Sequence, residues 1–221
     1  MTQEIIEFKV GGLTLQEPMA LITNWMMSLF SLYAFSKLKK IDFEEVVLWR
    51  KFFFWFTITS FFAGLGHLFF QQFGIPGKYP NWITSVLAGF YAGFAMLFNF
   101  KSNLLKSFLI FKGIVLLILS IIFQKFIFIA VDAILTYIIY CGIIGYKLTK
   151  SISLDYKFMY IGVLVCVPSV FIFLLQFNPH KWLNKDDLSH LLMLCCLIFF
   201  YLGANARFKS LSSNLNVKIA L

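Results

Sequence analysis

The stretch DDLSHLLMLCCLIFFYLG, residues 186–203, places two carboxylates and an imidazole directly before a long apolar run. In a helix, Asp186 lies four residues and Asp187 three residues before His190, so either acid can share a face with the histidine. The run from Leu191 to Gly203 is typical of a helix inside a lipid bilayer. We therefore expect a membrane-spanning helix whose first turns carry a polar face with metal-ligand chemistry.

The composition of the whole chain extends this expectation. Of its 221 residues, 60% are hydrophobic and 13% are charged, and the mean hydropathy is +0.83. A soluble domain of this size could not keep so much apolar surface from water. A hydrocarbon core of about 30 Å needs about 20 residues of helix, and seven stretches approach that length: 18–37, 48–72, 82–100, 104–123, 126–147, 156–177 and 187–206. The sequence predicts an all-α membrane protein, one bundle of seven transmembrane helices over residues 1–221.

The segments at the two ends of the chain complete the predicted organisation. Residues 4–16 alternate loosely around Gly11 and Gly12, a pair that permits a tight hairpin turn. Residues 1–17 are therefore expected to form a short hairpin or irregular cap on the membrane surface. Residues 207–221 are expected to form a tail.

Lysine and arginine are distributed unevenly between the two sides of the predicted bundle. One set of alternate connections, together with the tail, holds thirteen of them, and the other set holds five. Connections rich in these residues stay in the cytoplasm. The N-terminus is therefore expected outside and the tail in the cytoplasm, in the plasma membrane. The net charge of +9 lies largely in these connections, so no nucleic-acid partner is expected.

With this orientation, polar residues of several helices fall at one depth. Thr23, Asn24, His67 and Asp132 join the opening residues of the last helix within about 10 Å of the outer boundary, at about 1.5 Å of rise per residue. Ionisable side chains inside a membrane are energetically costly and usually face the bundle interior or a wet cavity. Their common depth favours a site over separate structural roles.

Two histidines and one or two carboxylates have the ligand chemistry of an open zinc (Zn²⁺) site. His67, His190 and Asp186 are the candidate ligands, and Asp187 or Asp132 is the candidate proton acceptor. Structural alternatives remain open: Asp132 as a hydrogen-bond partner for another helix, and the paired acids as a helix cap. A haem held by the two histidines is a further alternative, which a red colour would reveal.

Two other features have structural explanations. Lys112, in the fourth stretch, is expected to extend its amine toward the cytoplasmic boundary. The four cysteines lie inside apolar stretches without CxxC spacing, which favours packing over disulfides or a thiolate site: Cys141, Cys166, Cys195 and Cys196.

Several of these residues together resemble the CREST superfamily, which includes the alkaline ceramidases and the progestin/adiponectin-receptor proteins. In alkaline ceramidases the first helix begins with Glu and has Asn, preceded by Ser, seven residues later; Glu17 with Thr23 and Asn24 fits that spacing. Their second helix carries Ser-x-x-x-His and their seventh His-x-x-x-His, which form the zinc site with an Asp of the third helix. The resemblance implies that His67 and His190 are zinc ligands, with Glu17, Thr23 and Asn24 as supporting polar residues.

The chain departs from that pattern at three places. Ala63 stands where the serine belongs and Asp186 where the first histidine of the last helix belongs. The third helix offers no acid at its start, only Asn81, Thr84 and Ser85. The resemblance implies a zinc-dependent hydrolase of a lipid amide or ester, with membrane lipid as its partner. The alternative is a noncatalytic receptor, scaffold or transporter-like protein whose polar layer ties the helices together.

Overall fold

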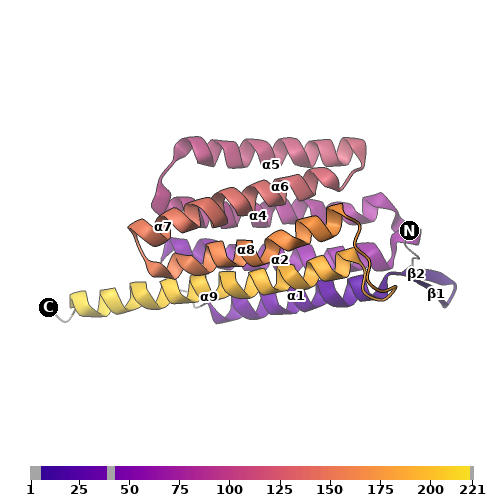
Figure 1. Ribbon diagram of the computed structural model, residues 1–221, viewed down its shortest axis with the longest axis horizontal. Coiled ribbons are helices and arrows are strands. Elements are labelled where there is room, and N and C mark those ends of the chain that lie inside the picture. The colour runs from indigo at the N-terminus through magenta and orange to yellow at the C-terminus, as the bar shows by residue number, and fades with distance from the viewer. Residues whose placement is uncertain (1–5, 39–42, 220–221) are drawn as a thin grey trace.

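A computed structural model of the chain describes residues 6–38 and 43–219 and confirms the all-α fold (Figure 1). Within the described residues, seven helical units are long and apolar enough to cross a membrane. The elements are α1 (Pro18–Lys37), α2 (Glu44–Leu68), α3 (Phe70–Phe73), the 3₁₀ turn η1 (Ile75–Lys78), α4 (Tyr79–Phe100), α5 (Asn103–Phe123), α6 (Ile127–Thr136), the π-helical η2 (Tyr137–Ile144), α7 (Gly145–Ser151), the 3₁₀ turn η3 (Leu154–Tyr156), α8 (Lys157–Leu174) and α9 (Lys185–Ile219).

Most helices lie within a few residues of their predicted bounds, and two of the differences have a clear consequence. Helix α2 begins at Glu44 rather than at residue 48, because two acidic residues fit the first turn, where the helix dipole favours negative charge. It ends at Leu68, and the positive φ of Gly74 (55°) then redirects the chain. Helix α9 continues to Ile219, through residues predicted as tail, and emerges from the bundle beside the C-terminus (Figure 1).

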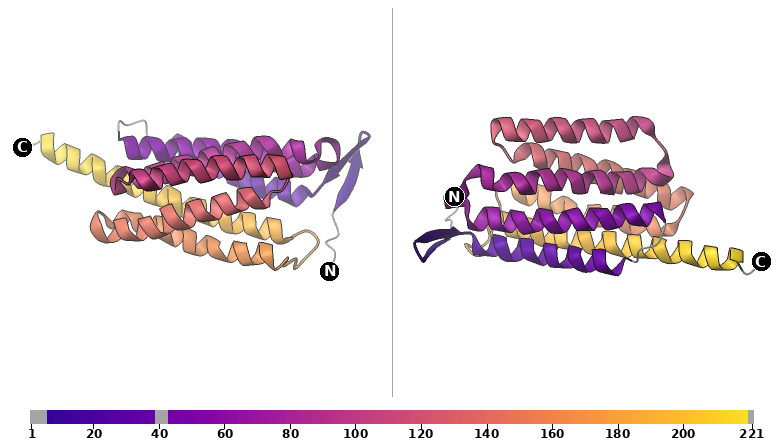
Figure 2. Two further views of the ribbon diagram at one scale, coloured as in Figure 1. Left: turned by 90° about the horizontal axis from the view of Figure 1, so that it is seen from above. Right: turned by 180° about the vertical axis from the view of Figure 1, so that it is seen from behind.

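The predicted N-terminal hairpin is confirmed. Strands β1 (Glu7–Val10) and β2 (Leu13–Gln16) pair in antiparallel register. Gly11 and Gly12 form the turn with φ angles of 56° and 83°, which residues that have a Cβ atom rarely adopt. The hairpin lies at the end of the bundle where α1 begins, called here the hairpin end; the opposite end, where α9 emerges, is called the C-terminal end (Figure 2).

Helices from the two ends of the chain lie side by side in the bundle. Helix α2 packs against both α1 and α4, and α9 packs against α1 and α8, whereas α5 lies at one edge against α4 and α6 (Figure 2). The core between them is aromatic; Phe52, for example, contacts the rings of Trp49 and Phe200 with centroids 5.4 and 5.9 Å apart. This arrangement places the last turn of α2, the first turns of α1 and the first turns of α9 together at the hairpin end.

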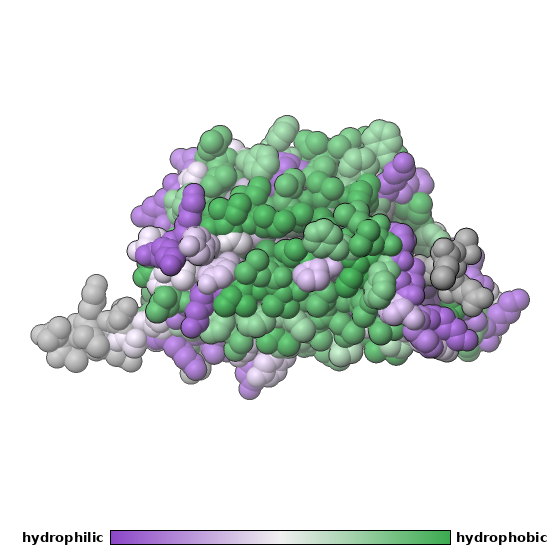
Figure 3. All heavy atoms as spheres, in the orientation of Figure 1, coloured by the Kyte–Doolittle hydropathy of each residue, from purple (hydrophilic) through white to green (hydrophobic). Residues whose placement is uncertain are grey.

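The surface has the distribution of polarity that suits a lipid bilayer. Figure 3 shows apolar side chains across the middle of one face and hydrophilic side chains toward both ends. Large apolar side chains such as Leu29, Phe111 and Leu164 are exposed on separate helices. In water such a surface would be unfavourable, whereas hydrocarbon chains solvate it.

Candidate functional site at the hairpin end

The structure brings His67 and His190 together. His67 lies in the last turn of α2 and His190 in the second turn of α9, and their ring centroids are 6.3 Å apart with the planes at 80°. The prediction that these two histidines meet inside the bundle is confirmed. What each ring can do depends on which of its nitrogens the surrounding residues occupy.

Glu17 holds the ring of His67. It directly precedes α1 in a left-handed conformation, and its Oε2 lies 2.7 Å from Nδ1 of His67. Burial alone raises the pKa of Glu17, but the hydrogen bond from His67 and the positive charges nearby, those of Lys78 and Lys185 included, outweigh burial and hold the pKa below its usual value. An ionised Glu17 accepts the Nδ1 proton, so in the neutral ring of His67 the lone pair is on Nε2.

Thr23 and Asn24, predicted as supporting residues, hold the ring of His190. Its Nδ1 lies 3.0 Å from Oγ1 of Thr23 and 3.3 Å from Nδ2 of Asn24. The hydroxyl of Thr23 donates to the carbonyl oxygen of Met19 at 3.0 Å, so its oxygen is left to accept the Nδ1 proton. With Nδ1 donating to Thr23, the lone pair of His190 is on Nε2, which lies 3.5 Å from the amide nitrogen of Asn24.

Asp187 caps α9 with one oxygen and leaves the other unpaired. Oδ1 of Asn184 accepts the backbone N–H groups of Asp186 and Asp187 at 2.8 and 3.1 Å, and Oδ2 of Asp187 accepts the N–H of Asn184 at 3.0 Å. The alternative that an acid caps the start of the last helix is therefore confirmed for Asp187. Asp187 is only 1% exposed, yet its Oδ1 has no hydrogen-bond partner among the described residues. A buried carboxylate oxygen without a partner calls for a ligand or a proton.

The other two predicted acids have different partners. The carboxylate of Asp186 pairs with Nζ of Lys185 at 3.6 Å and is partly exposed. The carboxylate of Asp132 pairs with Nζ of Lys112, which also donates to Oγ1 of Thr136 at 2.6 Å. Lys112 and Asp132 are 5% and 3% exposed. The expectation that Lys112 extends to the cytoplasmic boundary is wrong, because Asp132 provides a partner inside the bundle.

Two other polar places are the loop that contains His180 and the start of the third membrane helix. His180 lies exposed in the loop between α8 and α9, where its Nδ1 accepts the N–H of Trp182 at 3.2 Å. Thr84 of α4 accepts a hydrogen bond from Thr59 of α2 at 2.9 Å. The first contact lies within one loop, and the second links α2 to α4. Neither contact involves a residue that holds the ring of His67 or His190.

The donor chemistry of this cluster fits a zinc ion. Histidines that bind zinc commonly donate their other ring N–H to a carboxylate or another oxygen, as His67 and His190 do here to Glu17 and Thr23. Two imidazoles on one tetrahedral zinc have centroids about 5–6 Å apart, since zinc–nitrogen bonds are about 2.0–2.1 Å. Among the residues described, no three His, Cys, Asp or Glu side chains are already assembled as a metal centre.

Comparison with known proteins assigns the chain to a family. The profile of a family of unknown function (DUF6962) matches residues 19–209. The chain belongs to this family. The DUF6962 match spans the helices from α1 into α9 and includes His67, Asp187 and His190, whereas Glu17 lies just before it. No curated protein and no solved structure matches the chain.

Proposed function

We propose that this protein is a membrane-embedded, zinc-dependent hydrolase that acts on a lipid amide or ester at the hairpin end. The observation that carries the proposal is the neighbouring pair of imidazoles, each with Nδ1 in a hydrogen bond to an oxygen of Glu17 or Thr23. His67 and His190 would hold zinc through these nitrogens, and a carboxylate of α9, predicted as Asp186, would be the third protein ligand. The resemblance to the CREST superfamily supports the same assignment.

The chain's own residues support hydrolysis at this position. When bound, zinc supplies a Lewis acid that polarises a carbonyl and lowers the pKa of water. The buried Oδ1 of Asp187 is available to accept a proton, while its Oδ2 stays fixed by the cap of α9. Glu17 and Thr23 fix the orientation of the two rings, so the site needs little rearrangement of these groups.

The surroundings of the cluster favour a lipid substrate. Trp25 follows Asn24 in α1 and stacks on Phe61 of α2, with ring centroids 5.7 Å apart. Both rings are about two-fifths exposed, at 39% and 42%. They present an apolar surface beside a polar cluster, which suits a molecule with an acyl chain and a polar carbonyl group.

We expect purified protein in liposomes, supplied with zinc, to release fatty acid from a lipid amide or a lipid ester. The His67→Ala variant should lose more than about 100-fold of the rate, because second-sphere changes alone cost 10–100-fold at metal sites. His180→Ala is the matched control, since that histidine is exposed and its Nδ1 bonds within its own loop. Equal rates for His67→Ala and the wild type, or a wild type inactive on both substrate classes, would overturn the proposal.

We further propose that the bundle is an integral protein of the plasma membrane, with the hairpin outside and the C-terminus in the cytoplasm. The support is the excess of Lys and Arg at the C-terminal end. In a cysteine-free background, a membrane-impermeant thiol reagent added to intact cells should label Lys9→Cys and leave Lys218→Cys unlabelled until the cells are opened. Labelling of both positions from one side would contradict this topology.

A second candidate function, a noncatalytic bundle, is favoured by one observation. The pairs Glu17–His67 and Thr23–His190 also link α1 to α2 and to α9. In that case, wild-type protein would contain no zinc, and alanine at either histidine would change only thermal stability. Zinc content and unfolding temperature, measured on the same samples, separate the two functions.

A further inference from the structure

Two lysine side chains from neighbouring helices converge on the outward face of α4 toward the C-terminal end. Helix α4 packs against α2 on one side and α5 on the other (Figure 2). Nζ of Lys51 in α2 lies 5.5 Å from the ring centroid of Tyr91, and Nζ of Lys106 in α5 lies 5.7 Å from that of Phe94. The centroids of these two rings of α4 are 6.5 Å apart. Two ammonium groups therefore reach the same stretch of α4 from its two flanks.

The polar groups at this place have no protein partner of opposite charge. Lys51 and Lys106 are exposed, and neither ammonium group makes an ion pair or a hydrogen bond to a residue that the structure describes. The hydroxyl of Tyr91 likewise has no hydrogen-bond partner among the described residues. An aromatic ring face stabilises an ammonium group only modestly. These three groups together provide the hydrogen-bond donors that an anionic oxygen accepts.

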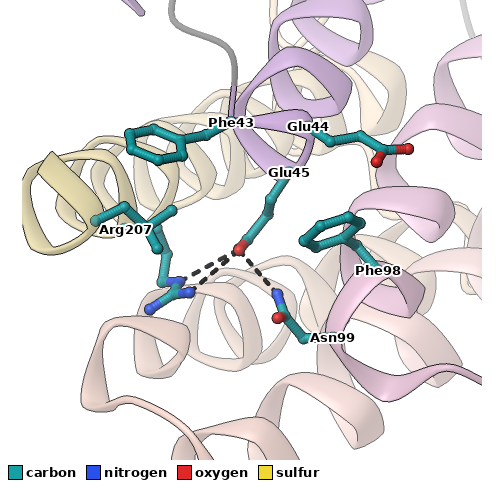
Figure 4. Close-up of a pocket in the computed structure, with 7 residues that line it drawn as sticks. Phe43, Glu44, Glu45, Phe98, Asn99 and Arg207 are labelled. Atoms are coloured by element: carbon teal, nitrogen blue, oxygen red, sulfur yellow. Dashed lines mark hydrogen bonds and ion pairs between the residues drawn. The ribbon is translucent and has the colours of Figure 1, made fainter. Parts of the chain in front are cut away.

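Two carboxylates at the C-terminal end, Glu44 and Glu45, do not pair with these lysines. Oε2 of Glu45 lies 3.2 Å from Nη2 of Arg207, within the network that Figure 4 shows. Glu44 lies beside Phe98 near the end of α4 (Figure 4). Phe98 is seven residues after Tyr91, which is about 10 Å along the helix axis. Glu44 is therefore nearer the end of the bundle than the ring over which Lys51 lies.

An apolar stripe continues from the two rings toward the middle of the membrane. At helical spacing, one outward stripe of α4 contains Ile83, Leu87, Tyr91, Phe94 and Phe98. Both lysines lie within about 10 Å of the start of their helices, near the level of the lipid headgroups. Basic side chains between membrane helices, next to an apolar helix face, match the phosphate and the acyl chain of a phospholipid.

We propose that the face of α4 between Lys51 and Lys106 binds one anionic phospholipid, with its phosphate at the two ammonium groups and the hydroxyl of Tyr91. One acyl chain lies along the apolar stripe toward Ile83. Charge complementarity selects this occupant, because an anionic headgroup pairs with both lysines whereas a zwitterionic headgroup also brings a positive charge to them. The site does not depend on the histidine cluster and stands whether or not the protein is a hydrolase.

Native mass spectrometry of the detergent-solubilised full-length protein tests this site. Phosphatidylglycerol and phosphatidylcholine of identical acyl chains are titrated one at a time, and glycerol 3-phosphate is titrated as a soluble anion. We expect the first molecule of phosphatidylglycerol to bind about tenfold tighter than phosphatidylcholine. Equal binding of the two lipids, or binding of glycerol 3-phosphate as tight as that of phosphatidylglycerol, would overturn the proposal.

Variants locate the binding. Lys51→Gln and Lys106→Gln are each expected to weaken binding of phosphatidylglycerol about fivefold, the contribution of one basic residue near a membrane surface. The double variant should bind both lipids equally. Lys150→Gln is the matched control, since Lys150 is also exposed and lies over a tyrosine ring, that of Tyr146 in α7, at 5.6 Å. A double variant that keeps the lipid preference would overturn the proposal. So would an equal loss in Lys150→Gln, which would show a response to overall charge alone.

Discussion

Replacing Asp132 with leucine is expected to lower the free energy of unfolding by about 3–5 kcal/mol, because it leaves the ammonium group of Lys112 buried without a counter-charge. Lys112 is only 5% exposed, and its remaining partners, the hydroxyl of Thr136 and a backbone carbonyl, are neutral. For a chain of this size the loss corresponds to a fall in the unfolding temperature of about 10 °C.

The double variant Lys112→Met/Asp132→Leu separates loss of the pair from loss of packing. Removing both charges is expected to restore most of the stability, since apolar replacements of buried ion pairs are often neutral. Lys106→Met, which removes an exposed lysine of the same helix, is the control. Thermal unfolding in detergent measures all four proteins. A single variant as stable as the wild type would show that the pair does not hold α5 to α6.

Replacing His190 with alanine is expected to remove both zinc and hydrolytic activity, because the site loses one of its two nitrogen donors. A zinc site with only one imidazole and carboxylates would bind the ion far more weakly. The variant should still fold, at a cost of about 1–3 kcal/mol for the polar groups of Thr23 and Asn24 that lose their partner. Zinc per protein and the rate of lipid hydrolysis are measured on the same preparation, with His180→Ala as the control.

A milder variant keeps this prediction testable if His190→Ala fails to fold. Thr23→Val removes the hydroxyl that holds Nδ1 of His190 but keeps the shape of the side chain. It is expected to weaken zinc affinity about 10–100-fold, the usual effect of losing a residue that orients a ligand. Unchanged zinc affinity in Thr23→Val would show that the hydroxyl does not orient a metal ligand.

Much of the fold follows from local patterns in the sequence. The hairpin follows from Gly11 and Gly12, whose positive φ angles the turn requires. The seven apolar stretches predict the seven long helices found among the described residues, because each stretch approaches the length that crosses a bilayer. The meeting of His67 and His190 followed from their common depth, since α2 and α9 run in opposite directions and each histidine is near the hairpin end.

The partners of individual charged residues could not be predicted in the same way. Hydropathy places a residue along a helix axis, but it does not fix the rotation of that helix about the axis. Asp132 shared the depth of the histidines, yet it faces Lys112 of α5. Arg207 was assigned to a tail, although the continuation of α9 buries it against Glu45. Asn184, which caps α9, was missed even though an acid follows it three residues later.

The zinc content of the purified wild-type protein, prepared without chelator and with zinc supplied, tests the central claim most directly. The proposed site predicts one zinc ion per chain, with X-ray absorption showing nitrogen and oxygen ligands at about 2.0–2.2 Å. It also predicts that His190→Ala, purified in parallel, contains no zinc while His180→Ala retains it. Folded wild-type protein without zinc, or equal zinc in the wild type and His190→Ala, would contradict the account.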